Sequence, residues 1–168
     1  MSASMPQINL TSHSISCIQN HQEENGAYHA SPEFIAYKGY CWLRDGSFIA
    51  HAMSTNGEVS SANKFFQWCS DTILKNEDLF LSILDDSYRG VQTPAESMPP
   101  TRFSFNGDIQ NDGWENFQLD GYGTWVWAAL RHVKTHNLDL TAWAKALSLT
   151  TRYIANCWDR TCYDWWEE

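Results

Sequence analysis

Apolar residues recur at the spacing of an α-helix in five segments of this 168-residue chain, whereas no stretch alternates apolar and polar residues for long enough to predict a sheet. The clearest helix should end at the turn His136-Asn137, and its expected inward stripe is Leu119, Tyr122, Val126, Leu130 and Val133. The next should begin at an Asp139 cap and bury Leu140, Trp143, Leu147, Thr151 and Ile154. These two helices should form an antiparallel hairpin.

Three further helices are expected earlier in the chain. One follows Asp45 and should bury Phe48, Ile49, Ala52 and Met53. Its partner follows the Asn56-Gly57 break and should bury Ala62, Phe65, Phe66, Cys69 and Ile73. A weaker helix over 12–22 should direct Ile15 and Ile18 inward. The sequence therefore predicts an all-α fold built of helical hairpins, joined by aromatic, aperiodic loops over 26–44, 88–118 and 157–168.

Charge and hydropathy exclude several classes of partner. The chain has 20 acidic and 11 basic side chains, a formal charge of −9, and no basic cluster, which argues against nucleic acid and against anionic membranes. The longest apolar run, Trp125–Leu130, is far shorter than the roughly 20 residues that cross a bilayer. Because the first residues carry no apolar leader, we expect a cytoplasmic protein.

The metal-ligating residue types show no ligand pattern. Five cysteines at irregular spacing suit free thiols in a reducing compartment. Cys157 and Cys162 have neither a second Cys pair nor a His pair nearby, and the six histidines form no metal-like pair. No glycine-rich phosphate loop is present either. We therefore expect no metal and no organic cofactor.

Three clusters combine Trp or Tyr with Arg, Asp or Glu, and they span 40–45, 114–120 and 163–168. Indole faces stack on the C–H faces of sugar rings, while Arg and carboxylates take ring hydroxyls in charge-assisted hydrogen bonds. Hydrolysis of a glycosidic bond needs one carboxylic acid to protonate the leaving oxygen and a second carboxylate to activate water or attack carbon. The clusters therefore point to a carbohydrate substrate.

Each cluster also has a purely structural interpretation. Asp45 could be a helix cap beside Arg44, and Asp120 could be a first-turn acid that the helix dipole favours. Asp164 and Glu167 have the spacing of a capping box. Large aromatics dominate protein cores, so a core position is expected for Trp114, Trp125, Trp127, Trp143 and Trp158. If all three clusters were structural, the chain would be an acidic helical interaction domain.

The same clusters resemble those of glycoside hydrolase family 15, the glucoamylase-like enzymes, from about Gly26 to the last residue. The segment 26–32 resembles the opening of the family's domain, and 40–45 resembles its Tyr-x-Trp-x-Arg-Asp signature. The segment 114–120 is similar to Trp-x-x-x-Gln-x-Asp, and 163–168 to Tyr-Asp-x-Trp-Glu-Glu. One departure is Lys38, where the family often has a Tyr two residues before Tyr40; Tyr37 is one step out of register.

The resemblance assigns roles residue by residue. It implies that Glu167 is the general acid, while Asp164 is a nearby acid that raises the pKa of Glu167 toward its working pH. It implies no metal ligand. The substrate-binding residues that it implies are Tyr40, Trp42, Arg44, Asp45, Trp114, Gln118, Asp120, Asp164, Trp166 and Glu168.

The family's general base lies in the second half of an (α/α)6 toroid of about twice this length or more. The resemblance therefore implies that residues 1–168 are the N-terminal half of such a domain, a partial toroid truncated after about five helices. The whole domain would be an exo-acting, inverting hydrolase of α-glucans or short α-glucosides, with α-1,4, α-1,6 and trehalose substrates all open. Because hydrolysis needs both carboxyls, the isolated chain should be inactive, and the missing C-terminal half should be its partner. A non-catalytic sugar-binding remnant of the same fold is the alternative.

Overall fold

A computed structural model describes residues 9–110, 112–113 and 117–164. These residues form six α-helices, one more than expected: α1 (Leu10–Asn20), α2 (Leu43–Thr55), α3 (Val59–Lys75), α4 (Glu77–Tyr88), α5 (Leu119–His136) and α6 (Ala144–Cys157). They also form two short 3-10 turns, η1 (Ala95–Ser97) and η2 (Thr141–Trp143), and two strands, β1 (Tyr40–Trp42) and β2 (Arg102–Ser104).

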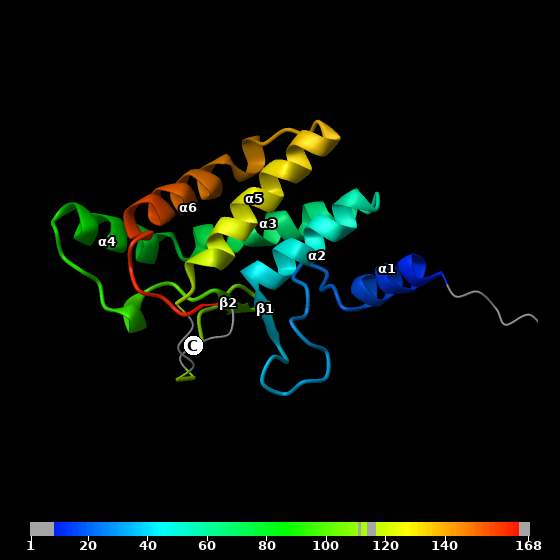
Figure 1. Cartoon of the computed structure of the whole chain (residues 1–168), viewed down its shortest axis with the longest axis horizontal. Helices are drawn as coiled ribbons and strands as arrows, with labels where there is room; N and C mark the ends of the chain where they lie inside the picture. Colours follow the sequence, from blue (N-terminus) through cyan, green and yellow to red (C-terminus); the bar gives the residue numbers. More distant parts are fainter. Residues whose placement is uncertain (1–8, 111, 114–116, 165–168) are drawn as a thin grey trace, which may run out of the picture.

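Four helices, α2, α3, α5 and α6, make up the body of the molecule (Figure 1). Helix α2 packs against α3 and α5, and α6 packs against α5, α3 and α4. Helices α2 and α5 both begin beside the two strands and run away from them, while α3 and α6 run back (Figure 1). The two expected hairpins, α2–α3 and α5–α6, are therefore both present, and they lie against each other.

The ends of α5 and α6 follow their sequence signals. Helix α5 ends at His136, and Asn137 takes the left-handed conformation that commonly terminates a helix, with φ of 50°. Asp139, one residue before Leu140 at the N-cap position of η2, accepts from the Thr141 backbone N–H through Oδ1 at 2.8 Å. This 3-10 turn leads directly into α6. Helix α2 differs, because it begins at Leu43 and places Asp45 in its first turn, so Asp45 is not a cap.

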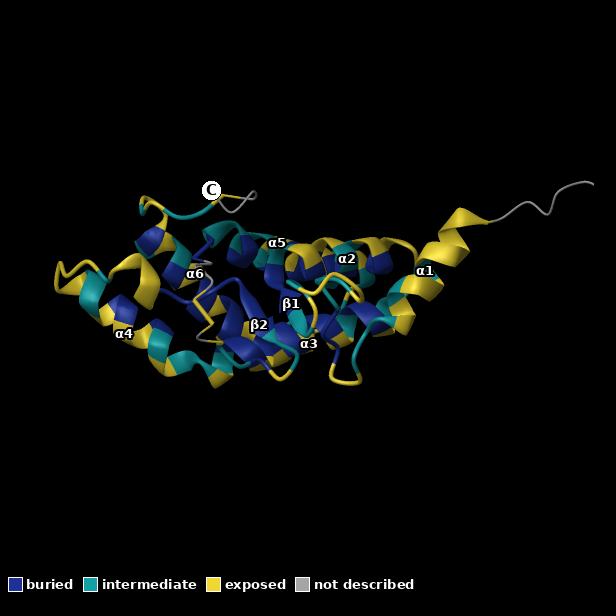
Figure 2. Ribbon diagram, turned by 90° about the horizontal axis from the view of Figure 1, so that it is seen from below, coloured by how far each residue is buried: buried dark blue, intermediate teal, exposed yellow. Residues whose placement is uncertain are grey.

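The core lies between the four body helices and extends to α4 and the two strands (Figure 2). Helix α3 buries the five residues predicted for it, Ala62, Phe65, Phe66, Cys69 and Ile73. Helix α1 lies at one end of the molecule and buries no residue fully, although Ile15 and Ile18 pack against the core as predicted.

Three helices bury a face that is rotated from the predicted stripe. Helix α2 leaves Phe48 43% exposed and buries Leu43, Gly46, Ser47, Ala50, Met53 and Ser54. Helix α5 leaves Leu130 44% exposed and buries Gly121, Tyr122, Trp125, Ala128, Ala129 and His132. Helix α6 exposes Thr151 and buries Tyr153 instead. The predicted stripes were chosen by hydrophobicity. Met53, Tyr122 and Leu147 are buried as predicted, and small residues share the inward positions with them.

Close approach explains why small residues face inward. A Cβ atom at Gly46 would lie 2.3 Å from the ring of Phe65 on α3, which is closer than such atoms can approach. A Cβ atom at Gly121 would lie 1.9 Å from Thr101 Oγ1. The two glycines therefore let α2 and α5 contact their neighbours at short range.

Helix α4 and the two strands lie outside the elements that the periodicity predicts. Helix α4 buries Phe80, Ile83 and Leu84 at helical spacing, and it follows α3 after the single residue Asn76. The strands pair antiparallel, with Tyr40 opposite Ser104, Cys41 opposite Phe103 and Trp42 opposite Arg102. Their three-residue length is too short to show an alternating pattern, so the loop prediction for these segments is wrong.

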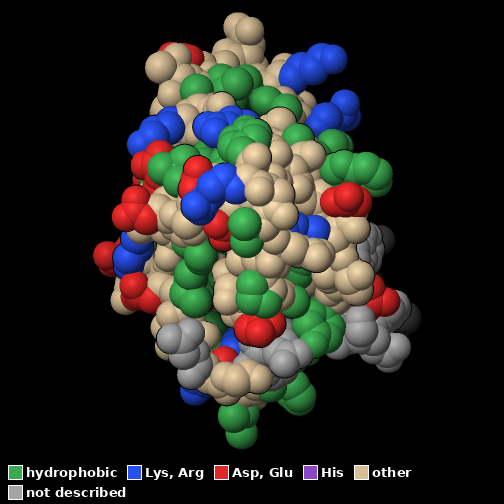
Figure 3. All heavy atoms as spheres, turned by 90° about the vertical axis from the view of Figure 1, so that its left-hand side faces the viewer, with side chains coloured by type: hydrophobic (Ala, Val, Ile, Leu, Met, Phe, Trp, Pro, Cys, Tyr) green, Lys and Arg blue, Asp and Glu red, His purple; other side chains and the backbone are tan. Residues whose placement is uncertain are grey.

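The tryptophans divide between core and surface. Trp125 and Trp143 are buried as predicted, but Trp127 is 42% and Trp158 74% exposed, so the core prediction is wrong for these two; Trp114 lies outside the described residues. On the face shown in Figure 3, acidic and basic side chains are interspersed with hydrophobic ones. Among the described residues, no helix combines the length and the apolar character needed to cross a membrane.

Candidate functional site

Strand β1 and the first turn of α2 carry the first cluster. Because alternate residues of a strand share a face, Tyr40 and Trp42 lie on one side of β1 and the fully buried Cys41 on the other. Trp42 is only 2% exposed, and its ring lies edge-on to those of Tyr37 and Tyr40, with centroids 5.0 and 6.3 Å away. The indole therefore has no open face for a sugar ring, and it supports the rings of Tyr37 and Tyr40.

The residue that departs from the family pattern, Lys38, lies next to a tyrosine that packs on Trp42. Lys38 is exposed, and its neighbour Tyr37 supplies the ring that packs against Trp42. Tyr37 also stacks on Phe34 at 5.3 Å. Tyr37, Tyr40 and Trp42 thus form one group of rings, which we call the aromatic wall.

Arg44 joins the first cluster to the second. Its Nη1 donates to Gln118 Oε1 at 2.5 Å and to Asp120 Oδ2 at 3.2 Å. Its Nε lies 3.5 Å from Asp45 Oδ2. The Arg44 side chain is only 11% exposed, and sheltered charge-assisted bonds of this kind are stronger than neutral ones. Two segments that are more than 70 residues apart in the sequence therefore meet at one guanidinium.

The start of α5 places Gln118 and Asp120 at this junction. Gln118 occupies the N-cap position and is fully buried, while Asp120 lies in the first turn, where the helix dipole favours a carboxylate. Asp120 is therefore a first-turn acid, as its structural interpretation predicts, and it also contacts Arg44. Its second oxygen, Oδ1, is buried and has no hydrogen-bond partner among the described residues.

The third cluster returns to the same place as far as the structure describes it. The Tyr163 backbone N–H donates to the Phe117 carbonyl at 3.0 Å, next to Gln118. Arg160 Nη1 donates to the Thr93 carbonyl at 3.1 Å and fixes the segment before it. Tyr163 is half-buried and Asp164 is exposed. The remaining predicted site residues lie outside the described residues, and they are Trp114, Trp166, Glu167 and Glu168.

The electrostatics of the junction centre on one cation and two carboxylates. Partial burial raises the pKa of the Asp45 carboxyl, which Arg44 opposes and the negative charge of Asp120 reinforces. Asp45 remains half-exposed, with 51% of its side chain accessible. The junction therefore presents carboxylate oxygens and a guanidinium side by side, the combination that takes the hydroxyls of a sugar as donors and acceptors.

Two residues of this region were not identified from the sequence. Arg102 on β2 is 3% exposed, and its guanidinium carbon lies 4.2 Å from the centroid of the Tyr40 ring and 5.7 Å from that of Trp42. Its Nη2 pairs with Asp112 Oδ1, and Asp112 Oδ2 accepts from the Tyr40 hydroxyl at 2.8 Å. The sequence signal for Arg102 and Asp112 was weak, because both residues fall in a segment without periodicity and belong to none of the three clusters.

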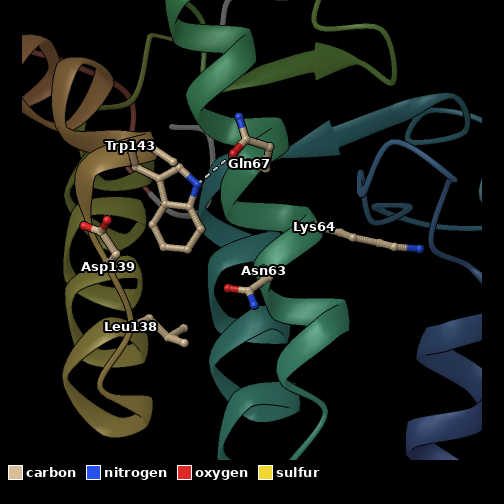
Figure 4. A pocket seen from close by; sticks show the side chains of 7 residues that line it. Asn63, Lys64, Gln67, Leu138, Asp139 and Trp143 are labelled. Carbon is tan, nitrogen blue, oxygen red and sulfur yellow. Dashed lines mark hydrogen bonds between the residues drawn. The ribbon is translucent and has the colours of Figure 1, made fainter.

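The described part of the chain holds no cluster of metal-ligating side chains. All five cysteines are free thiols, and no group of three or more His, Cys, Asp or Glu side chains is placed to hold a metal ion. A pocket of about 430 Å³ lies between α3 and the connection from α5 to α6, away from the start of α5 (Figure 4). There the Trp143 indole N–H donates to Gln67 Oε1 at 3.1 Å, Lys64 points away and Asp139 accepts from Thr141.

Comparison with known proteins links these observations to one family. The sequence model of "Glycosyl hydrolases family 15" matches residues 9–168. The isomaltose glucohydrolase of Kribbella flavida is 43% identical over 159 residues, which are 95% of this chain and 41% of that protein. Solved structures of a wild-type glycosidase and of a glycosidase variant in complex with glucose are 43% identical, with a TM-score of 0.91 over 95% of this chain.

The extent of these matches fits the all-α architecture described above. The chain spans about two fifths of the length of its relatives, 41% of the curated protein and 43% of the solved chains. It therefore has the expected partial toroid of helical hairpins. The family model matches residues 9–168, and both the curated relative and the solved structures cover 95% of the chain. The chain therefore belongs to glycosyl hydrolases family 15.

Proposed function

We propose that this chain is the N-terminal half of an exo-acting, inverting α-glucoside hydrolase and that it binds the terminal glucosyl unit where β1, α2 and α5 meet. The observation that carries the proposal is the bonding of Arg44 to both Gln118 and Asp120, which brings two of the three clusters to one point. The third cluster approaches the same point through the bond from Tyr163 to Phe117.

The side chains at this point suit the hydroxyls of a sugar ring. In the described part of the chain, no acceptor contacts Arg44 Nη2, so its N–H groups are available to a hydroxyl oxygen. Asp45 is half-exposed and can accept from a hydroxyl, and the buried Oδ1 of Asp120 has no donor among the residues that the structure describes. A glucosyl unit would supply both the acceptor and the donors.

The proposal gives Glu167 the role of general acid, which protonates the glycosidic oxygen as the bond to the anomeric carbon breaks. Glu168 and Trp166 then contact the sugar, and Asp164 favours the protonated form of Glu167 through like-charge repulsion. Inversion requires a second carboxylate about 6.5 to 9.5 Å away that takes a proton from the attacking water. In this proposal a further segment of the protein supplies that base, so residues 1–168 alone are inactive.

The relatives favour one substrate over the others. The Kribbella flavida protein is named an isomaltose glucohydrolase, and the chain is 43% identical to it. We therefore place isomaltose, an α-1,6-linked glucoside, first among the candidate substrates, ahead of maltose and trehalose.

Glucose release tests the proposal. The chain as given and the same chain extended through its downstream reading frame (the extended chain) are incubated with isomaltose, maltose and trehalose. Glucose should appear only with the extended chain and fastest from isomaltose. Glu167→Gln should reduce this rate by at least about 100-fold, because it removes the proton donor.

Glu96→Gln is the matched control, because it makes the same chemical change at an exposed position in η1. It should leave the rate unchanged. Activity that survives Glu167→Gln would refute the assignment of the acid. An inactive extended chain that still binds glucose would favour the sugar-binding remnant over the hydrolase.

A further inference from the structure

Arg102 and Asp112 both contact the aromatic wall, Arg102 from a buried position on β2 and Asp112 from a partly exposed one. Strand pairing sets Arg102 directly across from Trp42, and the guanidinium lies over the faces of both Tyr40 and Trp42. A guanidinium over an aromatic face is attracted by the ring quadrupole, most strongly where water is excluded. With 2% of its side chain exposed, Arg102 is in such a place.

Asp112 completes the arrangement by bonding to two partners at once. One carboxylate oxygen pairs with Arg102 Nη2 and the other accepts from the Tyr40 hydroxyl at 2.8 Å. Tyr40 is therefore fixed at two points, since its hydroxyl is bonded to Asp112 and one ring face is covered by Arg102. The Asp112 bond also raises the pKa of Tyr40.

We infer that Arg102 and Asp112 are positioning residues that pre-organise Tyr40 to contact the terminal sugar. Arg102 closes one face of the ring, so only the other face and the ring edge remain for a ligand. A ring whose rotamer is fixed before binding loses less conformational entropy when the sugar arrives. The inference rests on the proposed function, because it takes the site beside Arg44 to be the glucosyl site.

The test separates binding from chemistry in the extended chain. Arg102→Met keeps the length of the side chain and removes its charge, and it should raise KM for isomaltose about tenfold while kcat changes less than threefold. Arg102→Lys keeps a cation beside Asp112 and should give an intermediate KM. Asp112→Asn, at a position that is partly exposed and therefore tolerant, should raise KM in the same way as Arg102→Met.

Several outcomes would overturn the inference. One is an unchanged KM in both Arg102→Met and Asp112→Asn. Another is a loss of kcat at unchanged KM, and a third is a fall in melting temperature that accounts for all lost activity in both variants. Arg89→Met, which breaks the exposed ion pairs of Arg89 with Asp85 and Asp86 at the end of α4, is the matched control and should leave KM unchanged.

A second measurement does not depend on activity. The Cζ resonance of Tyr40 in ¹³C-labelled protein, assigned by its absence in Tyr40→Phe, reports the hydroxyl titration. In Asp112→Asn the resonance should titrate at lower pH than in the parent, and an unshifted titration would refute the bond that the inference needs. If the parent releases no glucose, the proposed function fails while this resonance still decides whether the ring is held.

Discussion

A buried chain of polar side chains joins three helices at the end of the bundle away from the candidate site. Ser54 Oγ lies 2.7 Å from His132 Nδ1 and 3.0 Å from His136 Nε2, and His132 Nε2 lies 3.0 Å from Asn63 Oδ1. Because Asn63 Oδ1 can only accept, His132 carries its proton on Nε2, and Nδ1 accepts from the Ser54 hydroxyl. The neutral imidazole satisfies both partners, and a second proton on Nδ1 would reverse the bond to Ser54 and place a positive charge in a buried position.

The ionisation of His132 should therefore make stability depend on pH. Burial, with the positive charge of His136 adding to it, lowers the pKa of His132 from 6.5 to about 4. A pKa below that of the unfolded chain means that the unfolded state binds the proton more readily, so the contribution is intact above pH 6.5. It is lost as the pH falls from 6.5 toward 4, by up to about 3 kcal/mol.

Urea unfolding of the extended chain at pH 7 and at pH 4.5 measures this loss. Carboxylates also titrate over that range, so the quantity of interest is the difference between the parent and His132→Gln. The variant should lose less stability on acidification than the parent does. His13→Gln, at an exposed position of α1, should behave like the parent, and an equal loss in all three proteins would contradict the prediction.

At the scale of single elements, α5 offers two glycines with opposite surroundings. A Cβ at Gly121 would meet Thr101 Oγ1 at 1.9 Å and the backbone nitrogen of Arg44 at 3.4 Å, whereas a Cβ at Gly123 would meet nothing within 4 Å. Gly121→Ala should destabilise the extended chain by about 1–3 kcal/mol and raise KM, because it pushes α5 from the start of α2. Gly123→Ala should be neutral or stabilise by up to about 1 kcal/mol.

Thermal unfolding of the two variants checks this pair of expectations. Both changes add one methyl group two residues apart in one helix, so helix propensity cancels in the comparison. Equal melting temperatures would mean that α5 does not need its close approach to Thr101.

The sequence predicts which segments form helices better than it predicts which side of each helix is buried. The five residues that α3 buries are large, so its stripe could be chosen correctly from hydrophobicity. Helix α2 buries Gly46, Ser47 and Ala50, and nothing in a single sequence marks such small residues as the inward side. Helix α4 could have been found, since Phe80, Ile83 and Leu84 have helical spacing after the acidic first turn of Glu77 and Asp78.

The residues of the candidate site likewise divide into those that the sequence predicts and those that it does not. The three clusters could be recognised because each is contiguous in the sequence and similar to a family motif. Arg102 and Asp112 could not, because their positions depend on the pairing of β2 with β1 and on a loop without periodicity. The contact of Arg44 with Gln118 likewise depends on how α2 and α5 pack, which periodicity does not determine.

At the scale of the whole molecule, the outward side of α2 and α5 carries apolar side chains that this chain leaves uncovered. Phe48 and Trp127 are 43% and 42% exposed with ring centroids 6.0 Å apart, and Leu130 is 44% exposed one turn further along α5. We call these three residues the α2–α5 ridge. Since relatives are more than twice as long, we propose that the remaining segment of the protein covers the ridge.

Substituting the ridge should therefore affect self-association in the chain as given and stability in the extended chain. In the chain as given, Phe48→Ser with Trp127→Ser should reduce self-association in sedimentation velocity, because it removes an exposed apolar surface. In the extended chain the same pair should lower the free energy of unfolding by about 2–4 kcal/mol, because it empties a buried contact. Leu81→Ser, of similar exposure but on α4, should have neither effect. If the extended chain tolerates the ridge substitutions as well as it tolerates Leu81→Ser, the added segment packs elsewhere. The segment that supplies the general base would then have to contact another face of the bundle.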